Sequence, residues 1–341
     1  MTELRFAILG TGFWSRYQLA GWRELPGVRC VACYNRTRSK AEALARDFGV
    51  PAAYDNVESL LDQEDLDFVD VITDVGTHRQ FVEQAVARQL PVICQKPLAP
   101  TLADAQAMLE TCTKAKVSLL VNENWRWQSP IRALKNIIAA GEIGTVFRAR
   151  IDYCNHFPVF ENQPALKQES RFILADMGSH ILDTARFLFG EAASIYCQTQ
   201  RVHPEIRGED VATVVLATVG GATVVCNLSY ASYLEHDSFP QTFALIEGTN
   251  GSVELRPDYW IHVTTPEGTT TRQHPPTLYP WINPRYAVVH ASIVECQRNL
   301  LQALRGEALA ETTGLDNLKT MTLVSAAYQS AATKTIIPLN P

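Results

Sequence analysis

An aspartate, a histidine and a lysine are placed where their side chains could exchange a proton with an alcohol. Asp176 and His180 are four residues apart, so they share a face if a helix begins there, and Asp183 could then orient the imidazole. Lys96 follows an apolar segment, 91–95, that is typical of a parallel strand. A proton acceptor beside a charged group is what interconversion of an alcohol and a carbonyl requires. An ordinary helix start with an acid in its first turn, and an ordinary strand end, are the alternatives.

A glycine-rich turn lies close to the N-terminus. Gly10 and Gly12 come directly after the apolar run 5–9 and precede an amphipathic stretch, 15–24. The first glycine permits a tight turn, and the second lets the backbone approach a pyrophosphate at the helix N-terminus. Ser15 occupies the third position of the motif, where glycine or alanine is usual. The pattern predicts a dinucleotide site, although a purely structural turn could use the same residues.

The type of dinucleotide depends on the end of the second strand, 28–34. Asn35 lies where an acidic residue would bind the ribose of NAD, and Arg36 and Arg38 follow it. Asn35 can bind a ribose hydroxyl without repelling a 2′-phosphate, and either arginine could contact that phosphate. NAD and NADP are therefore both compatible with this turn. A solvated basic turn before the next helix is the alternative.

The first third of the chain alternates strand and helix patterns, which is typical of a parallel sheet with right-handed crossovers. This predicts an α/β protein whose residues 1–122 form an N-terminal Rossmann dinucleotide-binding domain. The expected strands are 5–9, 28–34, 66–73, 91–95 and 118–122, and the expected helices are 15–24, 39–48, 78–89 and 102–116.

Residues 123–341 have a different pattern and are predicted to form a substrate-binding and oligomerisation domain. A helix at 131–140 is followed by β-rich segments at 146–153, 194–201, 211–218, 222–230, 242–247 and 252–256. Such a succession predicts a C-terminal α/β domain built on a mainly antiparallel open sheet. Two helices, 288–305 and 315–333, are expected at the end. The Thr- and Pro-rich stretch 257–284 could be a lid, an arm that contacts a partner or a plain loop.

The composition limits the classes of function. The chain has 341 residues, 30 Lys and Arg against 36 Asp and Glu, and a formal net charge of −6. A mildly acidic chain without a basic run is a poor partner for nucleic acid. Its apolar runs are too short to span a membrane, and no signal pattern is present at the N-terminus. We therefore expect a cytoplasmic protein that binds neither nucleic acid nor membrane.

The eight cysteines are predicted to be reduced core residues. Cys30 and Cys33 form a C-x-x-C pair, but they lie inside an apolar strand, and no second pair with metal-ligand spacing follows. Asp176 and His180 also lack a third ligand nearby in the sequence. No metal site is therefore predicted, and a zinc or redox role for the cysteines is the alternative.

Together these residues resemble those of the Gfo/Idh/MocA oxidoreductase family. The resemblance covers nearly the whole chain and lies in an ordered set of motifs: Gly10-x-Gly12, Gln95-Lys96-Pro97, Glu123-Asn124-Trp125-Arg126-Trp127, Asp176-x-Gly178-x-His180-x-x-Asp183 and Glu247-Gly248-x-x-Gly251-Ser252. Gln95 departs from the glutamate that is usual in the family, so a negative charge beside Lys96 is missing. The resemblance implies a Rossmann domain followed by an α/β domain whose open sheet often forms a dimer face.

The resemblance also implies roles for single residues. Lys96 and His180 are the implied acid/base pair, and Asp176 positions the reacting hydroxyl. The implied cofactor contacts are Gly10, Gly12, Phe13, Trp14, Asn35, Arg36, Thr73, His78, Gln95, Lys96 and Asn124. The implied substrate contacts are Lys96, Arg126, Trp127, Tyr153, Asn155, His156, Arg171, Asp176 and His180.

The implied activity is hydride transfer between NAD or NADP and a carbinol carbon of a sugar or polyol. The segments 12–18 and 95–97 resemble a subgroup that oxidises free aldoses, the branched pentose apiose among them, to lactones; this places NAD ahead of NADP. The C-terminal sheet implies a homodimer or homotetramer. Two alternatives stay open: a catalytically inactive, nucleotide-binding regulator of the same fold, and a reductase or dihydrodiol dehydrogenase. The presence of Lys96, Asp176 and His180 favours an enzyme over the regulator.

Overall fold

The protein is represented by a computed structural model that describes residues 3–235 and 239–340. These residues form two compact units, which we describe separately. Unit 1 comprises residues 1–124 and 293–318, and unit 2 comprises residues 125–292 and 319–341.

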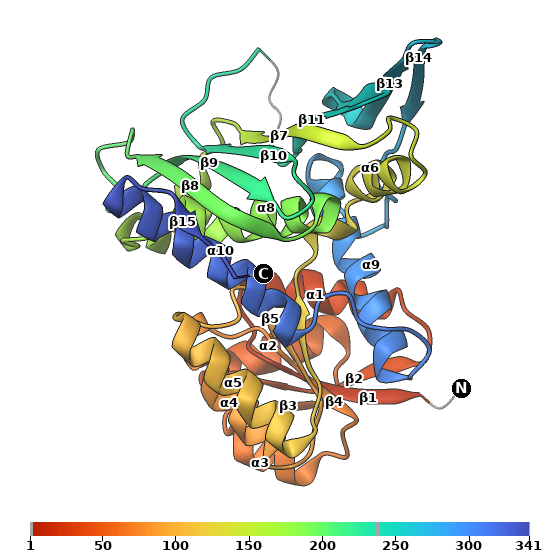
Figure 1. Ribbon diagram of the computed structural model, residues 1–341. Helices are drawn as coiled ribbons and strands as arrows, with labels where there is room; N and C mark the ends of the chain where they lie inside the picture. The colour runs from red at the N-terminus through yellow and green to blue at the C-terminus, as the bar shows by residue number, and fades with distance from the viewer. Residues whose placement is uncertain (1–2, 236–238, 341) are drawn as a thin grey trace. The chain divides into compact units, whose positions relative to one another are not determined.

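Unit 1 is built on a six-stranded parallel sheet with the strand order β3-β2-β1-β4-β5-β6 (Figure 1). The order reverses between β1 and β4, so the loops that follow these two strands diverge at the carboxyl edge, where open α/β sheets bind their ligands. The predicted Rossmann fold is confirmed. The strands are β1 (Leu4–Leu9), β2 (Val28–Tyr34), β3 (Ala52–Tyr54), β4 (Phe68–Val71), β5 (Val92–Gln95) and β6 (Leu119–Asn122).

The helices in the first segment of this unit connect its parallel strands. They are α1 (Phe13–Arg23), α2 (Arg38–Phe48), α3 (Val57–Gln63), α4 (His78–Val86) and α5 (Leu102–Ala115). The sequence patterns do not reveal β3 or α3, because a strand of three residues has no alternation to detect. A local signal for α3 does exist, since the side chain of Asn56 accepts a hydrogen bond from the backbone N–H of Ser59 and caps the helix.

Residues 293–318 return to unit 1 from the far end of the sequence. Gln297 donates a hydrogen bond of 2.6 Å to the side chain of Gln18, 279 residues away, and Thr312 donates one of 2.8 Å to the carbonyl of Val121. The domain limits drawn at 122 and 123 from the sequence place this segment in the second domain. The domain boundary between residues 122 and 123 stays a prediction. The division into compact units groups residues 293–318 with unit 1.

A buried carboxyl lies in the core of this sheet. Asp70 on β4 is fully buried and accepts hydrogen bonds from Trp22 Nε1 at 2.7 Å and Asn122 Nδ2 at 3.0 Å. Burial raises the pKa of Asp70 to about 7, although both hydrogen bonds oppose that rise. The aromatic rings of Phe6 and Phe68 stack beside Trp22 and exclude water from this side of the sheet.

Unit 2 contains a nine-stranded sheet with the order β14-β13-β12-β11-β7-β10-β9-β8-β15. Every neighbouring pair is antiparallel except β10 and β7, which confirms the predicted mainly antiparallel sheet. The strands are β7 (Val146–Cys154), β8 (Ala192–Gln200), β9 (Val211–Thr218), β10 (Thr223–Ser229), β11 (Phe243–Gly248), β12 (Gly251–Leu255), β13 (Trp260–Thr265), β14 (Gly268–Gln273) and β15 (Ile337–Pro338).

Helices cover one face of this sheet. The long helix α8 lies against the central strands β7, β9 and β10, and α6 lies next to it (Figure 1). The helices that contribute to unit 2 are α6 (Ser129–Ala139), α7 (Val159–Asn162), α8 (Ile173–Phe189), α9 (Ala287–Leu304) and α10 (Gly314–Thr333); the last two also contribute residues to unit 1.

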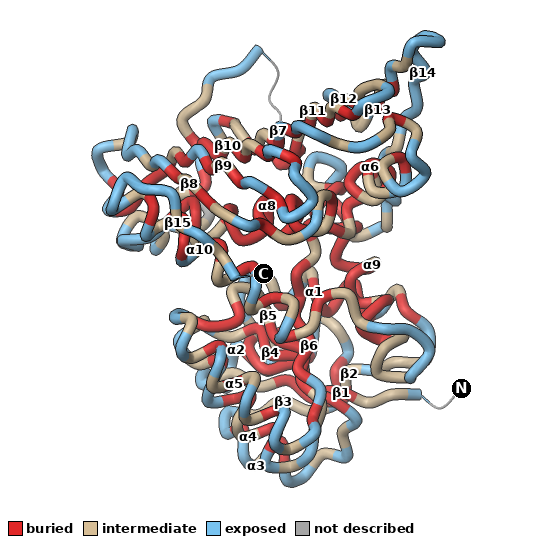
Figure 2. Tube along the Cα trace, viewed as in Figure 1, coloured by how far each residue is buried: buried red, intermediate tan, exposed pale blue. Residues whose placement is uncertain are grey.

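The Thr- and Pro-rich stretch 257–284, for which the sequence allows three interpretations, contains the β13–β14 hairpin. The hairpin extends the sheet, and every residue of the edge strand β14 is exposed (Figure 2). A fully exposed strand carries no alternation of apolar and polar residues, which explains why the sequence does not reveal it. Beyond the hairpin, Tyr279 and Trp281 pack against the buried Ile282.

All eight cysteines are free thiols. Burial raises the pKa of Cys33 to about 11, and it also raises the pKa of Cys30, so both thiols of the C-x-x-C pair stay protonated at neutral pH. Across the described ranges, no group of three or more His, Cys, Asp or Glu side chains is arranged to hold a metal ion. Within the same ranges, no helix combines the length and the apolar character needed to cross a bilayer.

We predict that Asp70 makes folding stability depend on pH. Its pKa is about 7 in the folded chain and about 4 in an unfolded one, so only the unfolded state is ionised between these values, and stability falls as pH rises through this window. From pH 5 to pH 8 the wild type should lose about 2–3 kcal/mol of unfolding free energy through this group. Asp70→Asn should abolish that loss, because an amide has no proton to lose in this pH range. The fold should tolerate the amide, since it could donate to Asn122 Oδ1, which has no partner among the described residues.

Urea denaturation at both pH values measures this difference. Asp65→Asn is the matched control, because the Asp65 side chain is 90% exposed and should leave the pH dependence as in the wild type. Parallel pH dependence in the wild type and in Asp70→Asn would contradict the account.

Candidate active site

The glycine turn of unit 1 is shaped by a close approach between two loops. Gly10 has a φ of +106°, and a Cβ on it would lie 2.5 Å from the carbonyl oxygen of Ile72, which directly follows β4. Any side chain here would push the loops after β1 and β4 apart.

Gly12 leaves an open space at the start of α1. A Cβ on it would meet nothing within 4 Å, and no side chain in the described part of the chain caps the helix. The hydroxyl of Thr11 is buried and has no hydrogen-bond partner among the described residues. Uncapped helix N–H groups and an unpaired hydroxyl fit a pyrophosphate, which such a helix start attracts.

The departures from the usual glycine motif have a structural reason. Ser15 is fully buried, and its hydroxyl donates a 2.6 Å hydrogen bond to the carbonyl of Gly12, so the serine holds the loop closed where a smaller residue would only leave room. Phe13 and Trp14 project beside the loop, and both rings contact that of Tyr17. The side chain of Phe13 is half-exposed, and that of Trp14 is partly buried.

The polar residues of the turn after β2 have different hydrogen-bond and ion-pair partners. Asn35 Oδ1 accepts a hydrogen bond of 2.9 Å from the backbone N–H of Thr37, which leaves its amide hydrogens for a ligand. Arg38 pairs with Glu42 at 2.9 Å and lies 3.7 Å from Asp55. Arg36 is exposed, and no carboxylate of the described residues pairs with it. Of the two arginines, Arg36 is therefore the one available to a cofactor.

His78 connects the loops that follow β4 and β5. Its imidazole is buried between two carbonyl oxygens, that of Thr73 at 3.2 Å from Nε2 and that of Leu98 at 3.2 Å from Nδ1. Burial lowers the pKa of His78, so the ring is neutral at pH 7 and donates to one carbonyl at a time. His78, which is predicted to contact the cofactor, is therefore a buried residue that holds the Thr73 loop next to the loop that carries Lys96.

Lys96 lies directly beyond β5, at the carboxyl edge of the parallel sheet. The side-chain oxygen of Gln95 accepts a 2.8 Å hydrogen bond from the backbone N–H of Lys96, which fixes the peptide between them. Both side chains are partly buried. Where the family has a carboxylate, this chain therefore has a neutral amide that orients the lysine backbone.

The start of α8 carries the other predicted catalytic residues. Glu209 accepts hydrogen bonds of 3.1 Å from the backbone N–H groups of Phe172 and Leu174, and the hydroxyl of Tyr328 donates to it at 2.7 Å. A carboxylate at a helix N-terminus satisfies N–H groups and interacts favourably with the helix dipole. Asp176 and His180 follow one turn apart, and α8 confirms that they lie on a continuous helix.

The imidazole of His180 stacks on an indole ring. The centroids of His180 and Trp125 are 4.6 Å apart and their planes differ by 24°, and only 5% of His180 is exposed. Trp125 is itself held by a 2.9 Å hydrogen bond from its Nε1 to the hydroxyl of Thr242. The plane of the His180 imidazole is thus set by an indole ring that is itself held by a hydrogen bond.

Asp183 forms a buried ion pair with Arg126. Arg126 Nε donates to Asp183 Oδ2 at 2.7 Å and Nη2 donates to Oδ1 at 2.5 Å, and the hydroxyl of Thr320 also donates to Oδ1 at 3.1 Å. Arg186 Nη1 lies 3.8 Å from the same oxygen. Asp183 is fully buried and Arg126 is 5% exposed. The pair joins the segment that carries Trp125 to the helix that carries His180.

Two buried phenols accompany Asp176. The rings of Tyr153 and Tyr230 are 5.9 Å apart and nearly perpendicular. Burial, and to a lesser degree the charge of Asp176, raises the pKa of Tyr153 and that of Tyr230, so both phenols stay protonated at neutral pH. They are therefore hydrogen-bond donors rather than bases.

The other residues of unit 2 that are predicted to bind the substrate lie in different environments. Asn155 is 2% exposed and accepts a 3.0 Å hydrogen bond from the backbone of Phe157. His156 is exposed and stacks on Tyr233, with 3.9 Å between the two ring centroids. The guanidinium of Arg171, also exposed, lies 4.7 Å from the ring centroid of Tyr328.

Trp127 and Asn124 stand on either side of the division between the units. The ring of Trp127 is partly buried under the guanidinium of Arg132, and its Nε1 has no partner among the described residues. Asn124 is partly buried at the end of the first segment of unit 1.

The structure brings the predicted residues together in two groups. In unit 1, the glycine turn and the residues Thr73, His78, Gln95 and Lys96 share the carboxyl edge of the sheet. In unit 2, Asp176 and His180 share α8.

Several supporting residues were not predicted from the sequence. They contact the site from far along the chain: Thr242, Glu209, Thr320 and Tyr328. They belong to no motif, and their contacts depend on the tertiary fold.

Comparison with protein families covers most of the chain. Residues 4–123 match the model described as "Oxidoreductase family, NAD-binding Rossmann fold", and residues 131–254 match the "GFO/IDH/MocA C-terminal domain". The two matches follow the order that the sequence motifs imply. They confirm the expected Rossmann fold and the binding of NAD by an oxidoreductase.

Curated relatives extend the match to nearly the full length. A D-apiose dehydrogenase of Rhizobium rhizogenes is 40% identical over 97% of this chain and 96% of its own, and one of Paraburkholderia graminis is 41% identical over 95% and 87%. A crystal structure of an oxidoreductase from Agrobacterium radiobacter, in complex with NAD+, L-tartaric acid and magnesium, superposes with a TM-score of 0.97. It is 39% identical and covers 99% of this chain and 98% of that chain. The chain belongs to the Gfo/Idh/MocA family of NAD-binding oxidoreductases.

Proposed function

We propose that this protein oxidises a free aldose at its anomeric carbon to the lactone with NAD, and that the branched pentose apiose is its substrate. The observation that carries the proposal is the full-length identity of 40% to a D-apiose dehydrogenase, in a chain that has Lys96, Asp176 and His180. A cyclic aldose presents one carbinol carbon whose oxidation yields a lactone, so the product needs no further step at that carbon.

The reaction requires one proton and one hydride to leave the substrate. The anomeric O–H bond breaks and gives its proton to the protein, while the C–H bond on the same carbon breaks and gives its electron pair away, so a C=O bond forms. Bound NAD would supply the acceptor for this hydride. The Gly12 turn would hold its pyrophosphate, and the Asn35 amide would hold the ribose of its adenosine part.

His180 is the proton acceptor in this proposal. Its stacking on Trp125 and its burial hold one ring nitrogen toward a bound hydroxyl and exclude water from the other side. Asp176, one turn earlier on the same helix, accepts a hydrogen bond from a sugar hydroxyl. Lys96 polarises the reacting oxygen as its proton leaves.

Arg126 contributes indirectly. Its guanidinium is engaged by both carboxylate oxygens of Asp183, so it holds the Trp125 segment on α8. A direct contact between Arg126 and the sugar stays a prediction.

The choice of cofactor follows from the turn after β2. Asn35 offers an amide N–H group to a ribose hydroxyl, which supports NAD, and no carboxylate at this position repels NADP. We therefore propose that NAD is the cofactor and that the chain also accepts NADP, with Arg36 as the residue that contacts the 2′-phosphate.

The open face of the sheet in unit 2 supports assembly into a homodimer or homotetramer. Val215, Val225 and Leu245 are partly exposed, and the strand register places them in one row across β9, β10 and β11, with Arg150 of β7 between the last two. A row of partly exposed apolar side chains on a sheet is typical of a protein interface.

The eight free thiols fit the reducing cytoplasm, where we place the protein.

Lys96→Met should abolish oxidation of D-apiose. We expect kcat to fall by at least about 100-fold, because general acid–base groups contribute about 10²–10⁴-fold, while the dissociation constant of NAD changes by less than about threefold. NADH absorbance measures the first, and quenching of tryptophan fluorescence by NAD measures the second. Lys114→Met is the control, because Lys114 is exposed on α5. Turnover retained by Lys96→Met would remove the lysine from the mechanism, and no turnover by the wild type with any aldose would overturn the proposed function.

Arg36→Ala should act on NADP alone. Loss of a guanidinium–phosphate contact should weaken NADP binding by about tenfold and leave NAD binding within about twofold of the wild type. Arg38→Ala is the matched control, because Arg38 is engaged by Glu42 and should leave both affinities unchanged. An equal loss for both cofactors would assign Arg36 to the shared adenosine part instead.

A further inference from the structure

A cavity of about 490 Å³ lies within unit 2, between α6 and the end of β14. Figure 1 shows α6 and the β13–β14 hairpin in the same part of this unit. The polar residues of its lining are Ser129, Arg132, Asn136, Glu142, Arg272 and His274. None of them belongs to the motifs that indicate the dehydrogenase.

The lining is rich in hydrogen-bond donors and positive charge. Two arginines, Arg132 and Arg272, line the cavity with one acidic residue, Glu142, whose carboxylate pairs with Arg272. His274 Nε2 is buried and has no hydrogen-bond partner among the described residues. Ser129 and Asn136 add a hydroxyl and an amide. Such a lining favours an anion that also accepts hydrogen bonds.

The walls of the cavity are fixed to one another. The hydroxyl of Ser129 donates a 3.0 Å hydrogen bond to the carbonyl of His274, which joins the start of α6 to the strand exit. The guanidinium of Arg132 lies 4.4 Å from the ring centroid of Trp127 and 5.0 Å from that of Phe187, so its plane is held between two aromatic side chains. A cation that is already oriented loses little conformational entropy when it binds a ligand.

Glu142 occupies the site as an internal carboxylate. Its oxygens accept hydrogen bonds from both terminal nitrogens of Arg272, at 3.3 and 3.1 Å, in the two-pronged geometry with which arginine binds a free carboxylate or phosphate. The Arg272 side chain is 48% exposed and that of Glu142 31%, so solvent and solutes reach the pair. An incoming oxyanion could replace Glu142 at this guanidinium.

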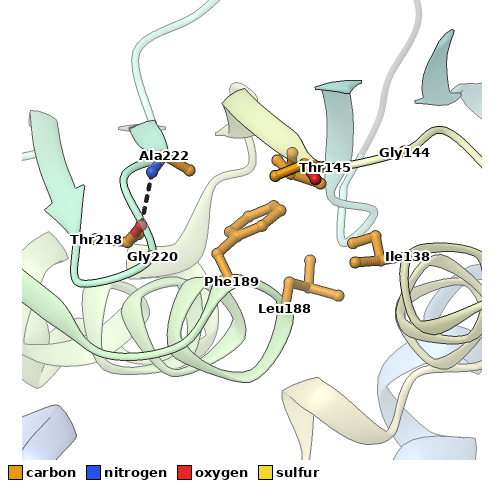
Figure 3. A pocket seen from close by; sticks show the side chains of 9 residues that line it. Ile138, Gly144, Thr145, Leu188, Phe189, Thr218, Gly220 and Ala222 are labelled. Atoms are coloured by element: carbon orange, nitrogen blue, oxygen red, sulfur yellow. Dashed lines mark hydrogen bonds between the residues drawn. The ribbon is translucent and has the colours of Figure 1, made fainter. Parts of the chain in front are cut away.

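Another cavity of this unit has a different character. It measures about 240 Å³ and is lined by Ile138, Leu188 and Phe189, and its Thr218 hydroxyl already accepts a hydrogen bond of 2.9 Å from the N–H of Ala222 (Figure 3). No charged side chain lines it. The smaller cavity therefore lacks the arginines that line the larger one.

We propose that the cavity between α6 and β14 is a second binding site that takes a small oxyanion, a metabolite with a carboxylate or a phosphate group. Its anionic group binds between the guanidinium groups of Arg132 and Arg272, and His274, Ser129 and Asn136 bind its remaining oxygens. Glu142 competes with the ligand for Arg272. The site requires neither the cofactor nor the sugar, so it stands independently of the proposed reaction.

Calorimetric titration of the NAD-saturated protein tests the site with two probes, sodium gluconate and inorganic phosphate, at constant ionic strength adjusted with chloride. Saturating NAD occupies the phosphate-binding turn of unit 1, so this turn does not contribute to the heat. The wild type should bind at least one probe saturably, and the probe that binds identifies the anion as a carboxylate or a phosphate. Arg272→Gln and Arg132→Gln should each weaken that binding by about tenfold or more.

Glu142→Gln gives the most specific expectation, because removal of the competing carboxylate should tighten binding by about tenfold. The matched control is Glu247→Gln, which removes the carboxylate of a similar two-pronged pair with Arg148 on the sheet, outside the lining of either cavity, and should leave anion binding as in the wild type. Absence of saturable binding in both the wild type and Glu142→Gln would overturn the proposal. So would binding that Arg272→Gln and Arg132→Gln leave unchanged, since the anion would then occupy another site.

Discussion

The buried ion pair between Arg126 and Asp183 is the interaction on which the candidate site of unit 2 depends. Both charged groups are desolvated, and the attraction between them offsets this cost only when the geometry is favourable and further hydrogen bonds satisfy the remaining polar atoms. Here the guanidinium uses two nitrogens, and Thr320 completes the coordination of the carboxylate. Loss of one partner would leave a buried charge without compensation. The pair therefore joins two segments that are 57 residues apart in sequence, and the stacking of His180 on Trp125 follows from that connection.

In unit 1, neutral groups rather than an ion pair hold the loops of the candidate cofactor site together. Three loops meet at the carboxyl edge of a parallel sheet, where their backbones must approach closely enough to bind a dinucleotide. The absence of a side chain at Gly10 allows the first contact, the buried imidazole of His78 bridges the next two loops, and the amide of Gln95 fixes the peptide of Lys96. None of these contacts requires a charge. Among the residues predicted to bind the cofactor, Lys96 and the exposed Arg36 carry positive charge, which suits an anionic ligand.

The sequence is sufficient to predict the alternating first sheet, the antiparallel second sheet and the positions of the motif residues, because these depend on local periodicity and on short spacings. It is not sufficient for elements without an apolar pattern, such as β3 and the exposed hairpin strand β14. It also does not reveal what surrounds a motif residue. Arg126 and His78 are recognisable from the sequence as candidate site residues, but their burial and their partners depend on Asp183, Thr320 and Leu98, which only the tertiary fold brings near.

In the proposed reaction, the Arg126–Asp183 pair positions His180 for proton transfer. The most direct measurement is kcat for D-apiose oxidation by Asp183→Asn, alongside the dissociation constant of NAD, with circular dichroism to confirm that the variant is folded. The account predicts that kcat falls by at least about tenfold, because the neutral amide cannot hold Arg126 with two charged hydrogen bonds, while NAD binding stays within about twofold of the wild type. A kcat within twofold of the wild type in the folded variant would contradict it.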